Sequence, residues 1–280
     1  MSETVDAAVK RLTIDLAREG VDNPRLDARV LVGHVLGLSP GETFLRGDTT
    51  LSAAQAATLE QFATRRRARE PVSRILGHRE FWGLDFVVNA DTLDPRPDTE
   101  ALVSAVLDLK DRWPNPRVLD LGTGTGCILI SILNEWPTAT GIGVDISAAA
   151  IDCAAENARR LGVGDRAAFT ISNWADDVGE RYDIVVANPP YLSSDEMAAR
   201  APEVMFDPPQ ALGGGADGLD AYRKILGMIP KIARLGAVLA FEIGAAQGES
   251  VAALIAAYGL KVREIRNDLA GQKRCILADI

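Results

Sequence analysis

Four consecutive residues, Asn188, Pro189, Pro190 and Tyr191, are the best suited to chemistry, and they follow the apolar run YDIVVA. A residue before proline favours an extended backbone and each proline ring fixes φ, so the Asn188 side chain and the Pro189 carbonyl are held in set directions. Two acceptors that converge on one point suit a planar NH2 group, because each N–H meets one oxygen. Tyr191 could cover the flat face of that group. The competing interpretation is a rigid turn with no further role.

A segment of alternating glycines and threonines follows the apolar run RVLDL. Its members are Gly122, Thr123, Gly124, Thr125 and Gly126. Glycines at these spacings let the backbone turn sharply and approach a ligand closely. A dinucleotide fingerprint has its third glycine one position later, where this chain has Cys127, so the phosphate-binding version fits poorly. The segment predicts a ligand loop, and the alternative is a plain strand-to-helix turn.

An acidic residue and a tryptophan follow the next two strand-like runs. Asp145 lies at the distance past the glycines at which a carboxylate reaches both hydroxyls of a ribose. Its alternative role is to cap the helix that begins near Ser147, although Ser147 could do so instead. Trp174 could lie against an adenine face, and a buried core tryptophan fits nearly as well. Together with the glycines, these positions predict an adenosine-containing ligand without saying which one.

These residues need a scaffold that brings them to one edge, and the larger part of the chain predicts one. Short apolar runs alternate with helical stretches after Pro116, which indicates a doubly wound α/β fold with a parallel sheet covered by helices on both faces. Ligands bind such sheets at the carboxyl ends of the strands, near the point where the strand order reverses. The chemistry-bearing residues all follow strand-like runs, so we expect them to share that edge.

The first quarter of the chain has a different character. Apolar residues recur at helical spacing from Val5 to Leu16 and from Leu26 to Leu38, and Ser52 with Gln55 has the form of a capping box. The run FWGLDFVV predicts a β-hairpin. The expected organisation is a small helical domain at residues 1–70, a linker with a hairpin at 71–97 and an α/β domain at 98–280.

The distribution of charge argues against a nucleic-acid partner. Residues 1–70 hold 10 Lys and Arg and 10 Asp and Glu, so the whole net charge of −9 falls on residues 71–280. A protein that neutralises phosphates needs clustered cations. The dense cluster that exists, Arg65, Arg66, Arg67 and Arg69, is interpreted as a solvated helix end rather than a binding patch.

The cysteines, the histidines and the N-terminal residues argue against disulfide-linked, metal-binding, secreted and membrane-spanning proteins. Cys127, Cys153 and Cys275 are far apart and odd in number, so we expect reduced core residues and a cytoplasmic protein. The two histidines, His34 and His78, make a metal site improbable. The N-terminal twenty residues carry acids and bases throughout, so neither a signal peptide nor a membrane span is expected.

At this point the chain resembles the release factor glutamine methyltransferases of bacteria. The likeness covers nearly the whole chain and includes EPVSRILGHREFWGLDFVV, PRPDTEALV, LDLGTGTGC, GVDIS, NPPY, FDPPQALGGGADGLDAYRKI, FEIGAAQ and DLAGQKR. The resemblance implies a seven-stranded methyltransferase sheet, S-adenosyl-L-methionine as cofactor with S-adenosyl-L-homocysteine as product, and class 1 peptide chain release factors as protein substrate. A monomer is expected, although no residue pattern in the sequence indicates the oligomeric state. Asp98 and Asn173 depart from the family pattern, which has Glu and commonly Asp at these positions.

The resemblance also assigns roles to residues. Residues 122–126, Asp145, Trp174 and Asn188 would contact S-adenosylmethionine, and the segment Asn188 to Tyr191 would hold the glutamine of a Gly-Gly-Gln motif. We expect Asn188 and the Pro189 carbonyl to hold the glutamine NH2 during direct methyl transfer, with Tyr191 beside it. Two enzymatic alternatives stay open: glutamine methylation of a ribosomal protein, and methylation of adenine N6 in DNA. A binding module without activity would fit a degraded glycine loop or NPPY, and neither is degraded.

Overall fold

The structure, a computed structural model, describes residues 3–39 and 41–280, and the chain divides into two compact units. Unit 1 comprises Met1–Gly77 together with Ala201–Phe206, and unit 2 comprises His78–Arg200 together with Asp207–Ile280. The N-terminal helices thus share their unit with a short segment far along the chain.

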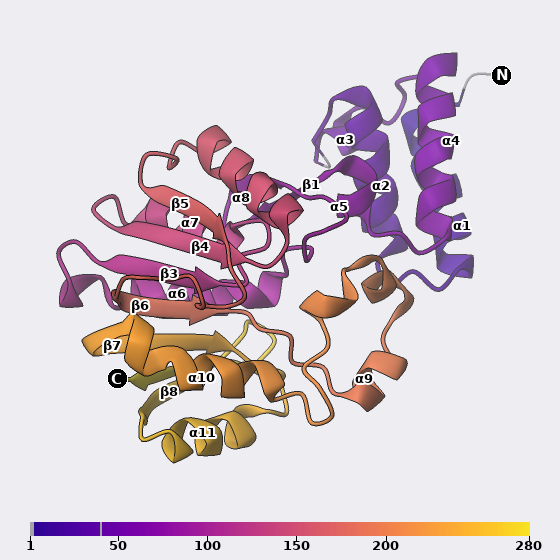
Figure 1. The fold of residues 1–280 in the computed structure, drawn as a ribbon. Helices are drawn as coiled ribbons and strands as arrows, with labels where there is room; N and C mark the ends of the chain where they lie inside the picture. Colours follow the sequence, from indigo (N-terminus) through magenta and orange to yellow (C-terminus); the bar gives the residue numbers. More distant parts are fainter. Residues whose placement is uncertain (1–2, 40) are drawn as a thin grey trace. The chain divides into compact units, whose positions relative to one another are not determined.

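Unit 1 is helical around its own apolar core. Its core includes Val5, Leu12 and Leu31, so the helical spacing read from the sequence marks the buried faces. Ser52 Oγ accepts a hydrogen bond from Gln55 N while Gln55 Oε1 accepts one from Ser52 N, so the predicted capping box is confirmed. The helices are α1 Val5–Arg18, α2 Pro24–Leu36, α3 Glu42–Leu45, α4 Ala53–Arg67 and α5 Val72–Leu76, with the 3-10 turn η3 Pro202–Phe206 (Figure 1).

The arginines at the end of α4 are ion-paired inside unit 1. Arg66 is buried and lies 2.7 Å from Asp27 and 3.2 Å from Glu203. Glu203 also lies 2.6 Å from Arg69. Arg65 pairs with Glu70, and Arg67 pairs with Glu60 and Asp15. The cluster is therefore neither a freely solvated helix end nor an open cationic patch, because acids from three other segments neutralise it.

Unit 2 begins with the predicted hairpin, β1 His78–Phe81 paired with β2 Leu84–Val87. Trp82 and Gly83 connect the strands with φ of 54° and 71°. Positive φ at both turn residues matches the twist of a two-residue hairpin and is unusual for a tryptophan. The Val87 backbone N–H donates to Asn157 Oδ1 at 2.8 Å, so the hairpin is fixed to the α/β core by a buried asparagine.

The main sheet has seven strands in the order β5-β4-β3-β6-β7-β9-β8. The strands are β3 Arg117–Leu121, β4 Thr140–Asp145, β5 Ala167–Ile171, β6 Tyr182–Ala187, β7 Ala233–Glu242, β8 Lys261–Asn267 and β9 Lys273–Asp279. The first five are parallel, as expected. Strand β9 lies between β7 and β8 and pairs antiparallel with both, so β9 alone runs opposite to the other six strands. The predicted parallel sheet is confirmed for those five strands, and β9 departs from it because the Asp268–Gly271 turn connects β8 to β9 directly, without a crossover helix.

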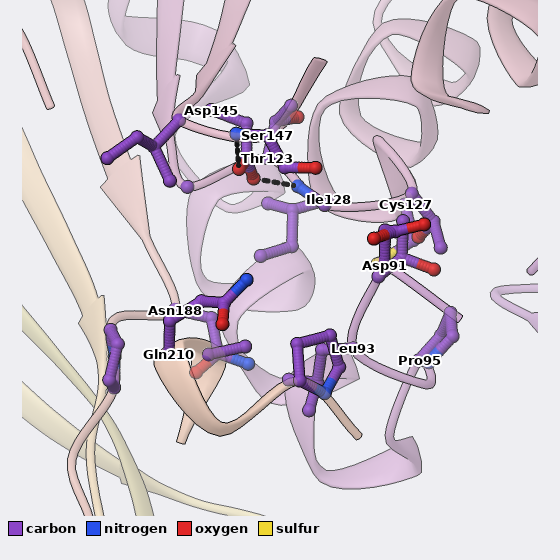
Figure 2. A pocket seen from close by; sticks show the side chains of 18 of the residues that line it. Asp91, Leu93, Pro95, Thr123, Cys127, Ile128, Asp145, Ser147, Asn188 and Gln210 are labelled. Atoms are coloured by element: carbon purple, nitrogen blue, oxygen red, sulfur yellow. Dashed lines mark hydrogen bonds between the residues drawn. The ribbon is translucent and has the colours of Figure 1, made fainter. Parts of the chain in front are cut away.

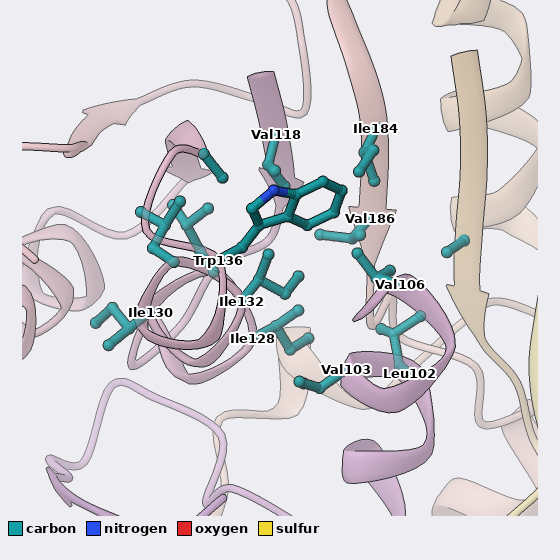
Figure 3. Packing of buried hydrophobic residues seen from close by; sticks show 14 of the residues in the cluster. Leu102, Val103, Val106, Val118, Ile128, Ile130, Ile132, Trp136, Ile184 and Val186 are labelled. Carbon is teal, nitrogen blue, oxygen red and sulfur yellow. The ribbon is translucent and has the colours of Figure 1, made fainter. Parts of the chain in front are cut away.

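Helices cover both faces of the sheet, and each face has its own core. One core includes side chains of α6 Glu100–Leu107, α7 Cys127–Glu135 and α8 Ala148–Arg160. Figure 3 shows part of it, with Trp136 among side chains of β3 and β6. The other core includes α10 Asp220–Ile232 and α11 Gly248–Ala257. The short helix α9 Ser194–Ala198 follows β6, and the 3-10 turns η1 Pro97–Thr99, η2 Lys110–Arg112 and η4 Pro209–Ala211 complete the unit. Over the part of the chain that is described, no helix combines the length and apolar character needed to cross a membrane.

Candidate active site

A cavity of about 250 Å³ opens at the carboxyl ends of β3, β4 and β6 in unit 2 (Figure 2). Strand β3 lies between β4 and β6, so the chain leaves β3 for one side of the sheet and later returns to the other. This is the switch point at which open α/β sheets bind ligands. The sequence placed its candidate residues at this edge, and the structure brings most of them to the walls of this cavity.

The glycine loop follows β3 and forms one wall. The backbone φ angles of Gly122, Gly124 and Gly126 are 74°, 54° and 79°. Residues with a Cβ rarely adopt this backbone conformation. A Cβ on Gly126 would lie 2.8 Å from Ile130 Cδ1, so this glycine serves the packing of α7 and does not line the cavity. A Cβ on Gly124 would meet no atom within 4 Å, which leaves its backbone open to a ligand.

The buried carboxyl group of Asp120 holds the glycine loop through a hydrogen bond to Thr123. Asp120 is fully buried in β3, and its Oδ2 accepts a hydrogen bond from Thr123 Oγ1 at 2.7 Å. Burial raises the pKa of Asp120 to about 7, and the Asp145 charge adds to this while the Thr123 hydroxyl opposes it. Thr123 therefore connects the glycine loop to strand β3 through this hydrogen bond. Its position between two glycines in the sequence did not predict that contact.

Asp145 ends β4 and holds two backbone groups at the cavity. Its Oδ2 accepts from Gly124 N and its Oδ1 from Ser147 N, both at 3.0 Å (Figure 2). Ser147 caps α8, since its hydroxyl accepts from Ala150 N at 3.3 Å. The alternative reading of Asp145 as the helix cap is therefore wrong. Each carboxylate oxygen keeps a further lone pair that can accept from a ligand hydroxyl.

Trp174 follows β5 and is only partly buried, so it is not a buried core tryptophan, and its contact with an adenine stays a prediction. It lines the cavity beside Ser172 and Asn173, and it also packs against the core on the α10 face. Its φ is 56°, and a Cβ on Gly122 would lie 3.8 Å from its ring. The indole is thus fixed next to the glycine loop, where an apolar ligand face can lie against it.

The Asn188 to Tyr191 segment follows β6, and only part of it faces the cavity. Asn188 and Pro190 line the cavity, whereas Pro189 is buried, Tyr191 is partly buried, and neither of these two lines the cavity. Asn188 Nδ2 donates to Thr99 Oγ1 at 3.4 Å, and the part of the chain that is described offers no donor to Asn188 Oδ1. Tyr191 is held on both sides: its carbonyl accepts from Gln247 Nε2 at 2.9 Å and its hydroxyl faces Glu242 at 3.5 Å. Burial raises the pKa of the Tyr191 hydroxyl.

Two further segments line the cavity, and their residues were not among the predicted site residues. One is the linker around Leu93, Pro95 and Arg96, and the other contains Pro208 and Gln210. Arg96 Nη2 lies 2.5 Å from Asp207 Oδ2, and Asp207 Oδ1 accepts from Asp94 N at 3.2 Å, so a buried carboxylate joins the two walls. Both places carry proline-rich motifs that belong to the family resemblance, PRPDTEALV and FDPPQALGGGADGLDAYRKI, but neither motif says what its loop contacts.

Asp98 and Glu100, which follow Arg96 in the chain, also have partners within unit 2. Asp98 lies 3.1 Å from Arg274, and Glu100 Oε1 accepts a hydrogen bond from Trp82 N at 2.9 Å. Both contacts order the linker against the α/β core, and neither residue lines the cavity.

The cavity has the groups that an adenosine-containing ligand requires. Asp145 offers carboxylate oxygens to ligand hydroxyls, and Gly124 offers its backbone groups. Apolar surface comes from Trp174, Ile146 and Leu93. Asn188, at the far side from Asp145, offers an amide oxygen. Within residues 3–39 and 41–280, no three His, Cys, Asp or Glu side chains form a group that could hold a metal ion. The arrangement therefore suits a nucleoside cofactor beside a substrate with polar N–H groups.

Family models and relatives match nearly the whole chain. The PrmC N-terminal domain matches residues 7–77, and the methyltransferase small domain matches residues 80–212. The release factor glutamine methyltransferase of Rhodospirillum rubrum is 50% identical over 260 residues, which cover 92% of this chain and 80% of the relative. The protein of the same name from Cereibacter sphaeroides is 46% identical over 278 residues, which cover 99% and 97%. That of Moorella thermoacetica is 38% identical over 280 residues, which cover 99% and 98%.

Solved structures share the fold at low identity. The hMettl16 catalytic domain in complex with MAT2A 3'UTR hairpin 1 has a TM-score of 0.60 at 15% identity, covering 89% of this chain and 90% of that one. A methyltransferase from Pyrococcus furiosus has a TM-score of 0.52 at 16% identity, covering 82% and 98%. At this identity the likeness concerns the fold alone.

Proposed function

The chain belongs to the release factor glutamine methyltransferase family, and from that premise we propose that it methylates the side-chain amide nitrogen of a glutamine in a peptide chain release factor. S-adenosylmethionine is the cofactor. When bound, it supplies an electrophilic methyl group for direct displacement by the substrate nitrogen. The finer assignment, the glutamine of the Gly-Gly-Gln motif in class 1 factors, is part of the same proposal.

One observation carries the assignment of the substrate site. Asn188 lies at the cavity with its Nδ2 engaged by Thr99, so its Oδ1 is the atom left to accept from a ligand. The buried Pro189 follows it in a segment whose prolines fix the backbone. An oxygen held in this way suits the N–H of a carboxamide, and the Pro189 carbonyl is proposed as the second acceptor.

The chemistry asks these residues to orient and activate a weak nucleophile. The lone pair of an amide nitrogen is delocalised into its carbonyl. Acceptors on both N–H groups favour its localisation on nitrogen, and they align that nitrogen for attack. The nitrogen would bond to the methyl carbon as the bond between that carbon and the sulfonium sulfur breaks, with S-adenosylhomocysteine as the leaving group. The cationic nitrogen would then return to a neutral amide by losing one N–H proton to water. This route needs no histidine base, in keeping with the site residues present.

Asp145, residues 122–125 and Trp174 are proposed to hold the cofactor. Asp145 would accept from the ribose hydroxyls, the glycine backbone would approach the cofactor closely, and Trp174 would lie against the adenine. Their positions at one cavity support this division of roles. Gly126 is proposed to act through packing, because its missing Cβ makes room for Ile130.

Unit 1 is proposed as the docking surface for the release factor. It has its own core and contributes none of the cavity residues, so a role outside the chemistry accounts for its presence. Selecting one glutamine among many requires contacts beyond a single amide pocket. We further propose that the enzyme acts as a monomer in the cytoplasm, where release factors meet the ribosome.

A competition experiment tests the substrate class. The protein is incubated with labelled S-adenosylmethionine and a mixture of a class 1 release factor, ribosomal proteins and adenine-containing duplex DNA. Label confined to the release factor is the expected result. Label in a ribosomal protein or in DNA instead would refute the proposal in favour of one of the two alternatives.

A further inference from the structure

The carboxyl edge of the sheet continues beyond the proposed substrate segment, away from the cofactor residues. The strand order places β3 and β4 on one side of β6, and β7, β9 and β8 on the other. Cys275 of β9 pairs with Glu242, the last residue of β7, so the turn that precedes β9 also lies at this edge. The cofactor is assigned to the ends of β3 and β4. A protein that brings a glutamine to Asn188 can therefore lie over the ends of β7 and β9.

The loops on this half of the edge are connected to the substrate segment by hydrogen bonds. Gln247, in the loop after β7, donates from its Nε2 to the carbonyl of Tyr191 at 2.9 Å. Ile243 N, before that loop, donates to the Arg274 carbonyl at 2.9 Å. Arg274 Nε lies 3.3 Å from Asp268 Oδ2 in the turn between β8 and β9. The turn is thus fixed, within unit 2, to the residues that follow β6.

A buried carboxylate orders this turn. The side chain of Asp268 is 4% exposed, and its Oδ1 accepts from Ala270 N and from Gln272 N, both at 2.9 Å. The backbone adds a hydrogen bond from Asp268 N to the Gln272 carbonyl at 2.8 Å. A turn with these internal bonds is preorganised, so a side chain that it presents loses little conformational entropy on binding a partner.

The side chain that the turn presents to solvent is a leucine. Leu269 is 104% exposed. A single exposed leucine is ordinary on a protein surface, and Leu235 is 99% exposed as well. The two differ in their place, because Leu235 lies near the start of β7 and hence toward the opposite edge of the sheet. Leu269 lies at the edge of the substrate segment, where the exposed Ala245 and Ala246 of the loop after β7 add further uncharged surface.

We propose that Leu269 is a recognition residue that binds an apolar surface of the release factor beside the reactive glutamine, and that Asp268 holds the turn in the position that this contact needs. The inference rests on the proposed function, because it takes the segment after β6 as the substrate site. Leu269 touches neither the glutamine nor the cofactor. Its contact is separate from the docking role of unit 1, since the turn belongs to unit 2.

The test measures the KM for an intact class 1 release factor with full-length variants. Leu269→Ser should raise this KM by roughly 10- to 100-fold, the range expected when one leucine side chain is no longer buried on binding. Leu269 does not line the cavity, so kcat and the Kd for S-adenosylhomocysteine should stay within a factor of about two of the wild-type values. Leu269→Met keeps an apolar side chain, and its KM should remain close to that of the wild type.

Leu235→Ser supplies the matched control. It removes an equally exposed leucine from the same unit, and its KM should equal the wild-type value. Asp268→Ala tests the order of the turn. It should raise KM in the wild-type background and add almost nothing in the Leu269→Ser background, because Asp268 acts through Leu269. The melting temperature of Leu269→Ser should match the wild type, since the side chain is exposed in the fold.

The outcomes separate the inference from the function on which it rests. A wild-type KM in Leu269→Ser, with the factor methylated normally, would overturn the inference and leave the proposed function intact. Equal increases in Leu269→Ser and Leu235→Ser, or weaker cofactor binding in Leu269→Ser, would overturn it too. Sedimentation that shows a wild-type dimer and a Leu269→Ser monomer would assign the residue to contact between copies instead. Failure of the wild-type protein to methylate the factor would overturn the proposed function itself.

Discussion

Replacing Asp145 by alanine should weaken cofactor binding far more than it weakens the fold. The carboxylate is the acceptor at the end of β4, and the proposal gives it both ribose hydroxyls. A hydrogen bond to a charged group contributes roughly 1.5 to 3 kcal/mol, so we expect the affinity for S-adenosylhomocysteine to fall by about this amount. That corresponds to roughly a 10- to 150-fold increase in Kd.

Asp145 also has a structural role, and control variants must separate that role from ribose binding. Asp145 also accepts from Gly124 N and Ser147 N, so its removal loosens the glycine loop as well. Asp145→Asn keeps one acceptor oxygen and should bind with intermediate affinity. Asp91→Ala removes another carboxylate from the rim of the same cavity and controls for the change in charge.

Isothermal titration calorimetry with S-adenosylhomocysteine measures the effect, and the melting temperature of each variant reports on the fold. We expect Asp145→Ala to bind weakly, Asp145→Asn to lie between it and the wild type, and Asp91→Ala to bind almost normally. Unchanged affinity in Asp145→Ala would refute the ribose role. Equal losses in Asp145→Ala and Asp91→Ala would show that the general charge of the cavity, rather than a specific hydrogen bond, attracts the ligand.

Three further changes test other parts of the account. Asn188→Ala should lose far more kcat than cofactor affinity, because its oxygen matters most while the amide is alkylated, and equal losses in kinetics and calorimetry would assign it to cofactor binding instead. Gly126→Ala should destabilise the fold by roughly 1 to 3 kcal/mol in urea denaturation, since its Cβ would meet Ile130 at 2.8 Å and its φ is 79°; unchanged stability would contradict the packing role. Removing residues 1–77, with Glu203→Gln so that no acid is left without its arginine partners, should preserve cofactor binding but sharply reduce methylation of the intact factor. Full methylation by that fragment would refute the docking role.

Much of the fold was predictable because local chemistry and periodicity agreed. Ser52 and Gln55 announce a capping box, and Trp82 with Gly83 interrupts two β-type runs at the hairpin turn. The two antiparallel strands at the end of the chain were less visible. Strand β8, KVREIRN, carries four charged residues and is only partly buried at the edge of the sheet, so it lacks the apolar run that marked β3 and β6.

The site residues that directly follow strands were predictable, whereas the contacts between distant segments that line the cavity were not. Asp145, the glycine loop and Asn188 could be placed at one edge because parallel strands end together. The contact between Arg96 and Asp207 spans 111 positions, and no local pattern could reveal it. The contact of Asn188 with Thr99 was hidden for the same reason, and Tyr191 was placed beside the substrate although its hydroxyl turns toward Glu242. Sequence spacing locates residues on elements, whereas side-chain pairing depends on the packed structure.

The most direct test of the central claim is to locate the methyl group. Tandem mass spectrometry of a class 1 release factor, taken after incubation with the protein and S-adenosylmethionine, should show a mass increase of about 14 Da on the glutamine of Gly-Gly-Gln. The fragment ions should place that increase on the side-chain amide, and the Asn188→Ala protein should not produce it. An unmodified glutamine in the presence of the active wild-type protein, or a methyl group on any other residue of the factor, would contradict the account.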